Sequence, residues 1–272
     1  KNEKKININN IKYYGKIQHR KHLKSTARQI KEIQPYASKI LHLNKSDIAL
    51  EFVNSKNLRK VASIGTSCPD HFLRTKRLPM ILPPLSDLIK SENKIDSIIK
   101  TYLNKYKEDY KKYYKRNKSK GSPNLRDPYP VIILIPEYGM MSFAKNKSTA
   151  RISSEFFCNA MNVMKGAEGI SKYTGLTEKE AFRIEYWELE EAKLRRMPPE
   201  KELVGKVALI TGAAGGIGSA TAKKFLSEGC CVILTDIDKK SLNTKAIDLE
   251  RWSKELFATL YAEAPLEAFK LF

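Results

Sequence analysis

The chain has 272 residues, of which 42% are hydrophobic and 29% are charged, which is enough apolar material for one large globular domain or two small ones. No apolar run approaches the ~18 residues that a membrane span needs, and no signal-peptide-like apolar segment follows the N-terminus. We therefore expect no membrane partner for this sequence.

The formal net charge of +20 is concentrated at one end of the chain. Residues 1–120 hold 29 of the 50 Lys and Arg but only 10 of the 30 Asp and Glu, so the remainder is close to neutral. A solvated basic face explains this excess more simply than a nucleic-acid site. The alternative, a polyanion-binding module in residues 1–120, requires an affinity that falls steeply with salt.

The four cysteines are Cys68, Cys158, Cys230 and Cys231, and none of them forms a CxxC pair. This pattern indicates reduced, buried thiols and hence a cytoplasmic protein. His19 and His22 are three residues apart, but Arg20 and neighbouring lysines surround them, so we expect solvent-exposed histidines rather than a metal site.

The first 120 residues are predicted to be largely helical, with apolar residues at helical spacing from 30 to 40. Two short strands are expected at 48–54 and 61–65. Residues 86–120 predict one long amphipathic helix, because isoleucines and tyrosines recur there every three or four residues. That regular period favours packing over stacking of the tyrosines on nucleic-acid bases.

Two polar groups are candidate phosphate contacts, each with a purely structural alternative. His71, Arg74 and Lys76 fall in a polar stretch expected to be a loop, where they could bind an anion together. Lys145 and Lys147 lie at the expected start of a helix that follows a strand, which is a second phosphate-type arrangement. The sequence leaves open whether any of the five touches a ligand.

The middle of the chain predicts a strand-to-helix unit over 130–165. The apolar run at 130–136 reads as a buried strand, and Ser148 is the expected N-cap of the helix after it. A further helix is expected over 177–197, with a capping box formed by Thr177 and Glu180, and with Phe182, Tyr186, Trp187 and Leu189 facing inward. Two prolines then begin a linker over 198–204.

The stretch from Gly205 to Asp238 predicts a strand, a glycine turn, a helix and a second strand. The buried strand 207–211 leads into the sequence TGAAGGIG. Gly212 suits the tight turn, Gly215 and Gly216 let a phosphate approach the backbone, and Gly218 allows close packing of helix and strand. Asp236 ends the second strand, where a carboxylate accepts the ribose hydroxyls and repels a 2′-phosphate. NAD is therefore the expected cofactor.

The spacing TGxxxGIG resembles that of the short-chain dehydrogenase/reductase (SDR) family. The resemblance implies that Gly212, Gly216, Ile217 and Gly218 hold the dinucleotide and that Asp236 selects NAD. The strings ASIGTSCPDHFLRTK, FAKNKSTARISSEFF and EYWELEEAKLRRMPPEKEL, followed by TGAAGGIG, together resemble the bifunctional rhamnulose-1-phosphate aldolase/short-chain dehydrogenases. In these, a zinc-dependent class II aldolase half precedes an SDR half. The resemblance implies sugar-phosphate cleavage and NAD-linked oxidation of lactaldehyde in rhamnose catabolism.

Both catalytic sets of that family are absent from the sequence. The only histidines are His19, His22, His42 and His71, so no His-x-His zinc motif is present and no metal ligand is assigned. Zinc is expected only in the full-length aldolase half. The Ser, Tyr and Lys of an SDR would follow a third strand, but residues after Asp238 look helical, and we expect this half to fold poorly alone.

The predicted fold class is therefore α/β: the C-terminal part of a class II aldolase-like domain in residues 1–197, then an incomplete Rossmann βαβ unit in 205–272. We expect an internal or truncated segment of the bifunctional enzyme that is inactive by itself. The alternative is a non-catalytic module that binds NAD or a polyanion. The oligomeric state is left open, a homo-oligomer included.

Overall fold

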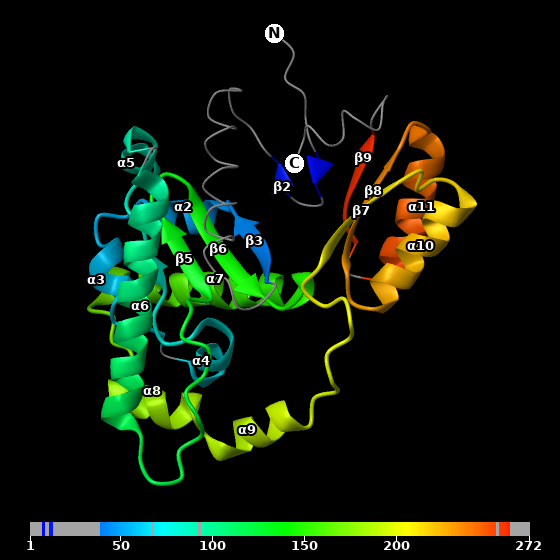
Figure 1. The fold of residues 1–272 in the computed structure, drawn as a ribbon. Coiled ribbons are helices and arrows are strands. Elements are labelled where there is room, and N and C mark those ends of the chain that lie inside the picture. The colour runs from blue at the N-terminus through cyan, green and yellow to red at the C-terminus, as the bar shows by residue number, and fades with distance from the viewer. Residues whose placement is uncertain are drawn as a thin grey trace.

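The computed structural model describes residues 7–8, 11–12, 39–66, 68–91, 94–253 and 256–261. Residues 30–37 of the predicted helical pattern lie outside these residues, as do His19 and His22. Its last residue, Ile40, begins a strand and not a helical turn. The first described elements are two short antiparallel strands, β1 (Asn7–Ile8) and β2 (Ile11–Lys12). The rest forms two units, each built on its own sheet, with a long connection between them (Figure 1).

The first sheet has four strands in the order β3-β6-β5-β4. They are β3 (Ile40–Asn44), β4 (Met80–Ile81), β5 (Ile132–Ile135) and β6 (Gly139–Ala144). β6 is antiparallel to both of its neighbours, and only β4 and β5 are parallel. The sheet is therefore mixed.

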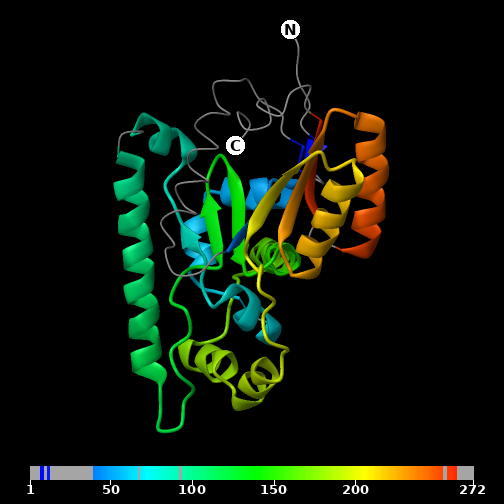
Figure 2. The same ribbon diagram turned by 45° about the vertical axis from the view of Figure 1, so that its right-hand side comes forward.

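Alternation along β5 shows how the sheet is covered on both faces. Ile133 and Ile135 pack into one apolar cluster together with Ile99 and Leu103 of the long helix α6 (Ile95–Asn117). The intervening Ile132 and Leu134 pack into a second cluster with residues of α7 (Lys147–Ile170). Because successive side chains of a strand point to opposite faces, the four buried residues of β5 bind one helical layer to each side (Figure 2). The result is a helix–sheet–helix sandwich.

The two strands predicted at 48–54 and 61–65 are helices in the structure. They are α2 (Asp47–Val53) and α3 (Leu58–Ala62). The side chain of Ser46 caps α2 by accepting a hydrogen bond from the Ala49 N–H, and Ala49, Phe52 and Val53 are buried on one helical face. A short apolar run fits both the two-residue period of a strand and the 3.6-residue period of a helix. Here the Ser46 cap favours the helix.

The strand at 130–136 is confirmed, but the unit that follows differs from the predicted strand-to-helix crossover. Residues 139–144 form β6, which turns back on β5 as a hairpin, with Glu137 at φ 65° in the turn. The N-cap of α7 is Asn146, whose side chain accepts from the Thr149 N–H, and not Ser148. The helix also continues to Ile170, beyond the predicted end at 165.

The predicted helix over 86–120 is present as two pieces, α5 (Leu85–Lys90) and α6. Its inward stripe is confirmed, because Ile95, Ile99, Leu103, Tyr110 and Tyr113 are all buried. The predicted helix over 177–197 is also divided, into α8 (Glu178–Glu185) and α9 (Glu188–Arg195). The capping box of Thr177 and Glu180 is present, and Phe182 and Tyr186 are buried.

Trp187 and Leu189 do not face inward as predicted. Their side chains are 50% and 57% exposed, because the chain bends at Tyr186–Trp187 and α9 has no buried residue. The connection after α9 runs without helix or strand to Lys206. Its residue Leu203 packs against the core of the second unit.

The second sheet has three parallel strands in the order β7-β8-β9: β7 (Val207–Thr211), β8 (Cys231–Asp236) and β9 (Leu256–Tyr261). Helices α10 (Gly216–Ser227) and α11 (Lys239–Trp252) cover one face of it (Figure 1). The third strand corrects the expectation that all residues after Asp238 are helical. The expected α/β fold class is confirmed, with a partial Rossmann-like unit of three strands.

β7 is less buried than predicted, because it is an edge strand of the described sheet. Val207 is 43% exposed, whereas β8, which is paired on both sides, is buried throughout except at Asp236. The cysteines also differ in part from the expectation: Cys230 and Cys231 are buried, but Cys68 is exposed. Among the helices that the structure describes, none combines the length and apolar character that a bilayer crossing requires.

Candidate functional site

The turn between β7 and α10 has the geometry that a nucleotide-binding glycine loop needs. Gly212 has φ +64°, a conformation that side chains disfavour. A Cβ at Gly218 would lie 2.2 Å from the carbonyl oxygen of Gly212, so only glycine fits where the helix passes the turn. A Cβ at Gly216, in contrast, would meet no described atom within 4 Å. The turn is therefore tightly packed at Gly218 and leaves free space beside Gly216.

Asp236, at the end of β8, is held against this turn by hydrogen bonds. Its Oδ2 accepts from the backbone N–H of Ala214 at 2.9 Å, and its Oδ1 accepts from the N–H of Asp238 at 3.0 Å. A carboxylate has about four lone-pair directions, so both oxygens retain acceptor capacity for ribose hydroxyls. The structure therefore brings together the predicted residues of the glycine motif and Asp236.

The first turn of α10 presents the remaining features of the site. Gly215 is the N-cap residue and makes no side-chain cap, so the N–H groups of the first turn have no partner inside the helix. These N–H groups and the positive end of the helix dipole are suited to a pyrophosphate. Ile217 is 88% exposed beside them, although it is a large apolar residue, and its side chain is free to lie against a ligand.

His71, Arg74 and Lys76 do not form the predicted anion-binding loop, because they belong to helix α4 (Pro69–Thr75) and its C-cap. His71 is buried, and its ring lies 5.4 Å from that of Phe156. The Arg74 guanidinium also lies over Phe156, at 5.1 Å. Lys76 points elsewhere: its ammonium donates to the carbonyl oxygens of Asp127 and Tyr129. The three side chains serve packing rather than one common ligand.

Lys145 is likewise engaged within the chain. Its ammonium, a candidate phosphate contact in the sequence, forms an ion pair with Glu200 in the connection between the two units. Lys147 is the first residue of α7. A phosphate contact for these two lysines stays a prediction.

A buried polar network, which the sequence did not predict, lies between α6 and α8. Glu185 is 1% exposed and accepts hydrogen bonds from the hydroxyls of Tyr110 and Tyr113, at 2.6 and 3.1 Å. The Tyr110 hydroxyl is also 2.8 Å from that of Tyr186. Burial raises the pKa of Glu185, and the hydrogen bond from Tyr110 opposes that rise. A usable signal was present, because tyrosines inside an apolar stripe need partners for their hydroxyls.

Lys76 lies next to this network, with its ammonium 4.2 Å from the centre of the Tyr110 ring. Burial lowers its pKa to about 7, although the negative charges of Asp127 and Glu185 act in the opposite direction. Its backbone has φ 61°, which is unusual for a residue other than glycine. The network therefore combines a buried cation, a buried carboxylate and three phenols.

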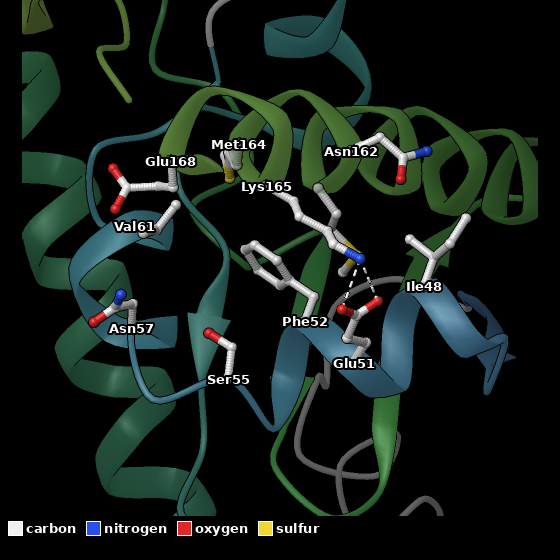
Figure 3. A pocket seen from close by; sticks show the side chains of 11 residues that line it. Ile48, Glu51, Phe52, Ser55, Asn57, Val61, Asn162, Met164, Lys165 and Glu168 are labelled. Carbon is white, nitrogen blue, oxygen red and sulfur yellow. Dashed lines mark hydrogen bonds and ion pairs between the residues drawn. The ribbon is translucent and has the colours of Figure 1, made fainter. Parts of the chain in front are cut away.

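The described residues of the first unit line at least two hollows. The smaller, of about 180 Å³, lies between α2, α3 and α7. Figure 3 shows the Lys165 ammonium and the Glu51 carboxylate paired at its edge, beside the apolar side chain of Phe52. The larger, of about 480 Å³, lies between α3, the segment leading into β4, and α6. Arginine and tyrosine side chains line the larger one, which makes it the better candidate for a ligand.

A metal site does not emerge from the described residues, which contain no group of three His, Cys, Asp or Glu able to hold an ion. His42 and His71 are on β3 and α4, and neither has such a group around it. The residues described here thus do not fit the zinc of a class II aldolase, and we derive no metal-assisted step from them.

Comparison with known proteins divides the chain at the same place as the fold. Residues 18–194 match the family model "Aldolase class II, second domain", and residues 206–263 match the model "short chain dehydrogenase". Together the two models cover both of the described units.

Individual relatives match over part of their length. The uncharacterized oxidoreductase YuxG of Bacillus subtilis is 39% identical over 202 residues, which are 73% of this chain and 29% of that protein. The 3-oxoacyl-(acyl-carrier-protein) reductase FabG of Thermotoga maritima is 52% identical over 48 residues, 18% of this chain and 20% of that protein. Among solved structures, an oxidoreductase of Escherichia coli, yciK, overlaps with a TM-score of 0.22 at 24% identity, covering 24% of this chain and 27% of that one.

Proposed function

Because the chain belongs to the class II aldolase second-domain family and continues into a short-chain dehydrogenase segment, we propose that it is part of a bifunctional enzyme. The proposed reactions are aldol cleavage of rhamnulose 1-phosphate and NAD-linked oxidation of the lactaldehyde released. The chain spans 29% of the length of the relative YuxG, and the activity proposed is that of the whole protein. The substrates proposed derive from the sequence resemblance described above.

The observation that supports a role for this chain is the position of Asp236 against the glycine turn. The first-turn N–H groups of α10 would hold the pyrophosphate of NAD, and Asp236 would accept from the ribose hydroxyls. NAD, when bound, supplies the acceptor for a hydride. The chain's own residues bind and orient it: Gly212 and Gly218 shape the turn, and Ile217 covers it. A 2′-phosphate would meet the Asp236 carboxylate, which disfavours NADP.

For the two chemical steps this chain supplies no complete catalytic set. The sequence contains no His-x-His for the aldolase metal, and the described residues contain no metal-ligating group. We therefore propose that the 272-residue chain binds NAD without turnover of either substrate. Membership of an enzyme in rhamnose catabolism, a cytoplasmic location and the oligomeric state remain part of this proposal.

Titration of the purified chain with NAD and NADP tests the cofactor proposal, with binding followed by calorimetry. We expect NAD to bind more tightly than NADP. Asp236→Ala removes the charged acceptor and should lower the ratio of the two affinities by about tenfold, as expected for loss of a hydrogen bond to a charged group.

Asp248→Ala is the matched control, because Asp248 is an exposed carboxylate of α11 away from the glycine turn. It should leave the ratio unchanged. An equal ratio in Asp236→Ala and in the unmodified chain would contradict the assignment of Asp236.

A further inference from the structure

The larger cavity, of about 480 Å³, has the size and lining of a ligand pocket and plays no part in the function proposed above. Its volume falls within the roughly 300–1,000 Å³ that is usual for small-molecule sites. Met80 and Ile81 contribute apolar surface. The arginines and tyrosines of its lining are three and four in number: Arg59, Arg77, Tyr102, Tyr106, Tyr110, Tyr113 and Arg116.

The charges around this cavity leave an excess of positive charge. Lys105 and Asp109 neutralise each other, at 2.6 Å. Arg116 forms a two-pronged pair with Glu178, at 2.9 and 3.0 Å, and Arg77 lies 3.8 Å from the same carboxylate. One carboxylate therefore serves two guanidinium groups. In the described part of the chain, Arg59 has no carboxylate within ion-pair distance.

Arg77 carries an unfulfilled hydrogen-bond donor at this site. Its Nε is buried and has no partner among the described residues. A buried donor without an acceptor destabilises a fold and is rare in proteins. Its guanidinium lies 5.9 Å from the centre of the Tyr113 ring, so an aromatic face lies beside the charge. The Arg77 side chain as a whole is 20% exposed and lines the cavity, so its terminal N–H groups can reach an oxyanion held there.

We propose that this cavity binds a small organic oxyanion, a phosphate or carboxylate carried on a flat apolar body. The planar guanidinium fork matches the two oxygens of such a group, and arginine pairs with it more specifically than lysine does. Arg77 and Arg59 hold the oxyanion, and Tyr102 and Tyr113 with Met80 contact the body. The site is separate from the glycine turn and does not depend on NAD.

Calorimetric titration of the whole chain with phenyl phosphate, benzoate and inorganic phosphate tests this assignment. Phenyl phosphate and benzoate share the flat body and differ in the oxyanion, so their relative affinities distinguish the two sources of the charge. We expect at least one of them to bind, and to bind at least about tenfold more tightly than inorganic phosphate.

Two variants locate the binding. Arg77→Met should abolish it, and Arg59→Gln should weaken it about tenfold or more, the usual effect of removing a charged hydrogen bond. Arg59 is exposed, so its variant tests the site even if Arg77→Met folds poorly. Lys111→Met is the control, because it removes a cation from the same helix α6 outside the cavity.

Three results would overturn the proposal. They are no binding of either organic oxyanion, equal binding of inorganic phosphate, and an affinity in Arg59→Gln that matches that of Lys111→Met.

Discussion

The hydroxyl of Tyr110 on α6 donates a hydrogen bond of 2.6 Å to the carboxylate of Glu185 on α8, in the interior of the first unit. These residues are 75 positions apart in the sequence, and their buried contact connects two helices. A buried carboxylate needs hydrogen-bond donors for its oxygens. The orientation of α8 therefore depends on the tyrosine hydroxyls that α6 supplies.

Tyr110→Phe should therefore destabilise the chain. It removes one donor to Glu185 and the neighbour of the Tyr186 hydroxyl, and it leaves the ring in place. We expect the free energy of unfolding to fall by about 1–3 kcal/mol in urea denaturation. Tyr102→Phe is the control, since no described partner bonds to its hydroxyl, and it should change the value by less than about 0.5 kcal/mol. Equal effects of the two changes would contradict this role of Glu185.

The buried Lys76 should make stability depend on pH. Its pKa is lowered from 10.5 to about 7, so between these values the unfolded chain binds a proton that the folded chain has released. Stability attributable to this group therefore rises as pH rises from about 7 to about 10.5. Urea midpoints across that range should rise less in Lys76→Met than in the unmodified chain. Lys111→Met, at an exposed pair on α6, should retain the full rise.

Two glycines of the turn should respond differently to the same substitution. Gly218→Ala places a Cβ 2.2 Å from the Gly212 carbonyl oxygen, so it should disrupt the turn and lower the thermal midpoint. Gly216→Ala meets no described atom within 4 Å, so it should leave the midpoint nearly unchanged.

The same pair also probes ligand binding. Gly216→Ala should weaken NAD binding, because its methyl group occupies the space where the pyrophosphate approaches. Tight NAD binding by a well-folded Gly216→Ala chain would contradict the proposed position of the cofactor. Differential scanning calorimetry with and without NAD separates the two effects.

The start of α7 offers a test of helix capping. Asn146→Ala removes the side-chain oxygen that accepts from the Thr149 N–H at 2.7 Å, and should lower the free energy of unfolding by about 0.5–2 kcal/mol. Ser148, the second residue of the same helix, does not make this cap, so Ser148→Ala should have a smaller effect. A larger loss in Ser148→Ala would mean that the helix begins later than described. Chemical denaturation of both variants provides the measurement.

The features predicted correctly are those whose signal is local. The glycine turn, β8 and the helix between them follow from residues at fixed spacing. Glycine is required there by close contacts with atoms only a few residues away in the sequence. The inward stripe of α6 and the capping box at Thr177 are similarly local. NAD as the cofactor stays a prediction, although the turn and Asp236 lie together as it requires.

The features predicted wrongly depend on partners far away in the sequence or on ambiguous short runs. β6 was missed because its sequence contains a glycine and a serine, and its strand form is fixed by pairing with β3. β9 was missed because Leu256 and Leu260 also fit a helical period, whereas pairing with β8 decides for a strand. The cavity and the Glu185 network join α6 to other elements, and no spacing rule relates them.

The pairing of β3 with β6 has a consequence for how the chain forms during synthesis. Ile40 lies opposite Ala144, so about a hundred residues must be made before this contact is available, whereas Val207 lies opposite Cys231. Contacts distant in the sequence form slowly because a large loop must close first. During synthesis on the ribosome, β3 therefore has no strand partner until β6 has emerged, and its apolar side chains stay exposed until then. The glycine turn, by comparison, can close soon after β8 leaves the exit tunnel.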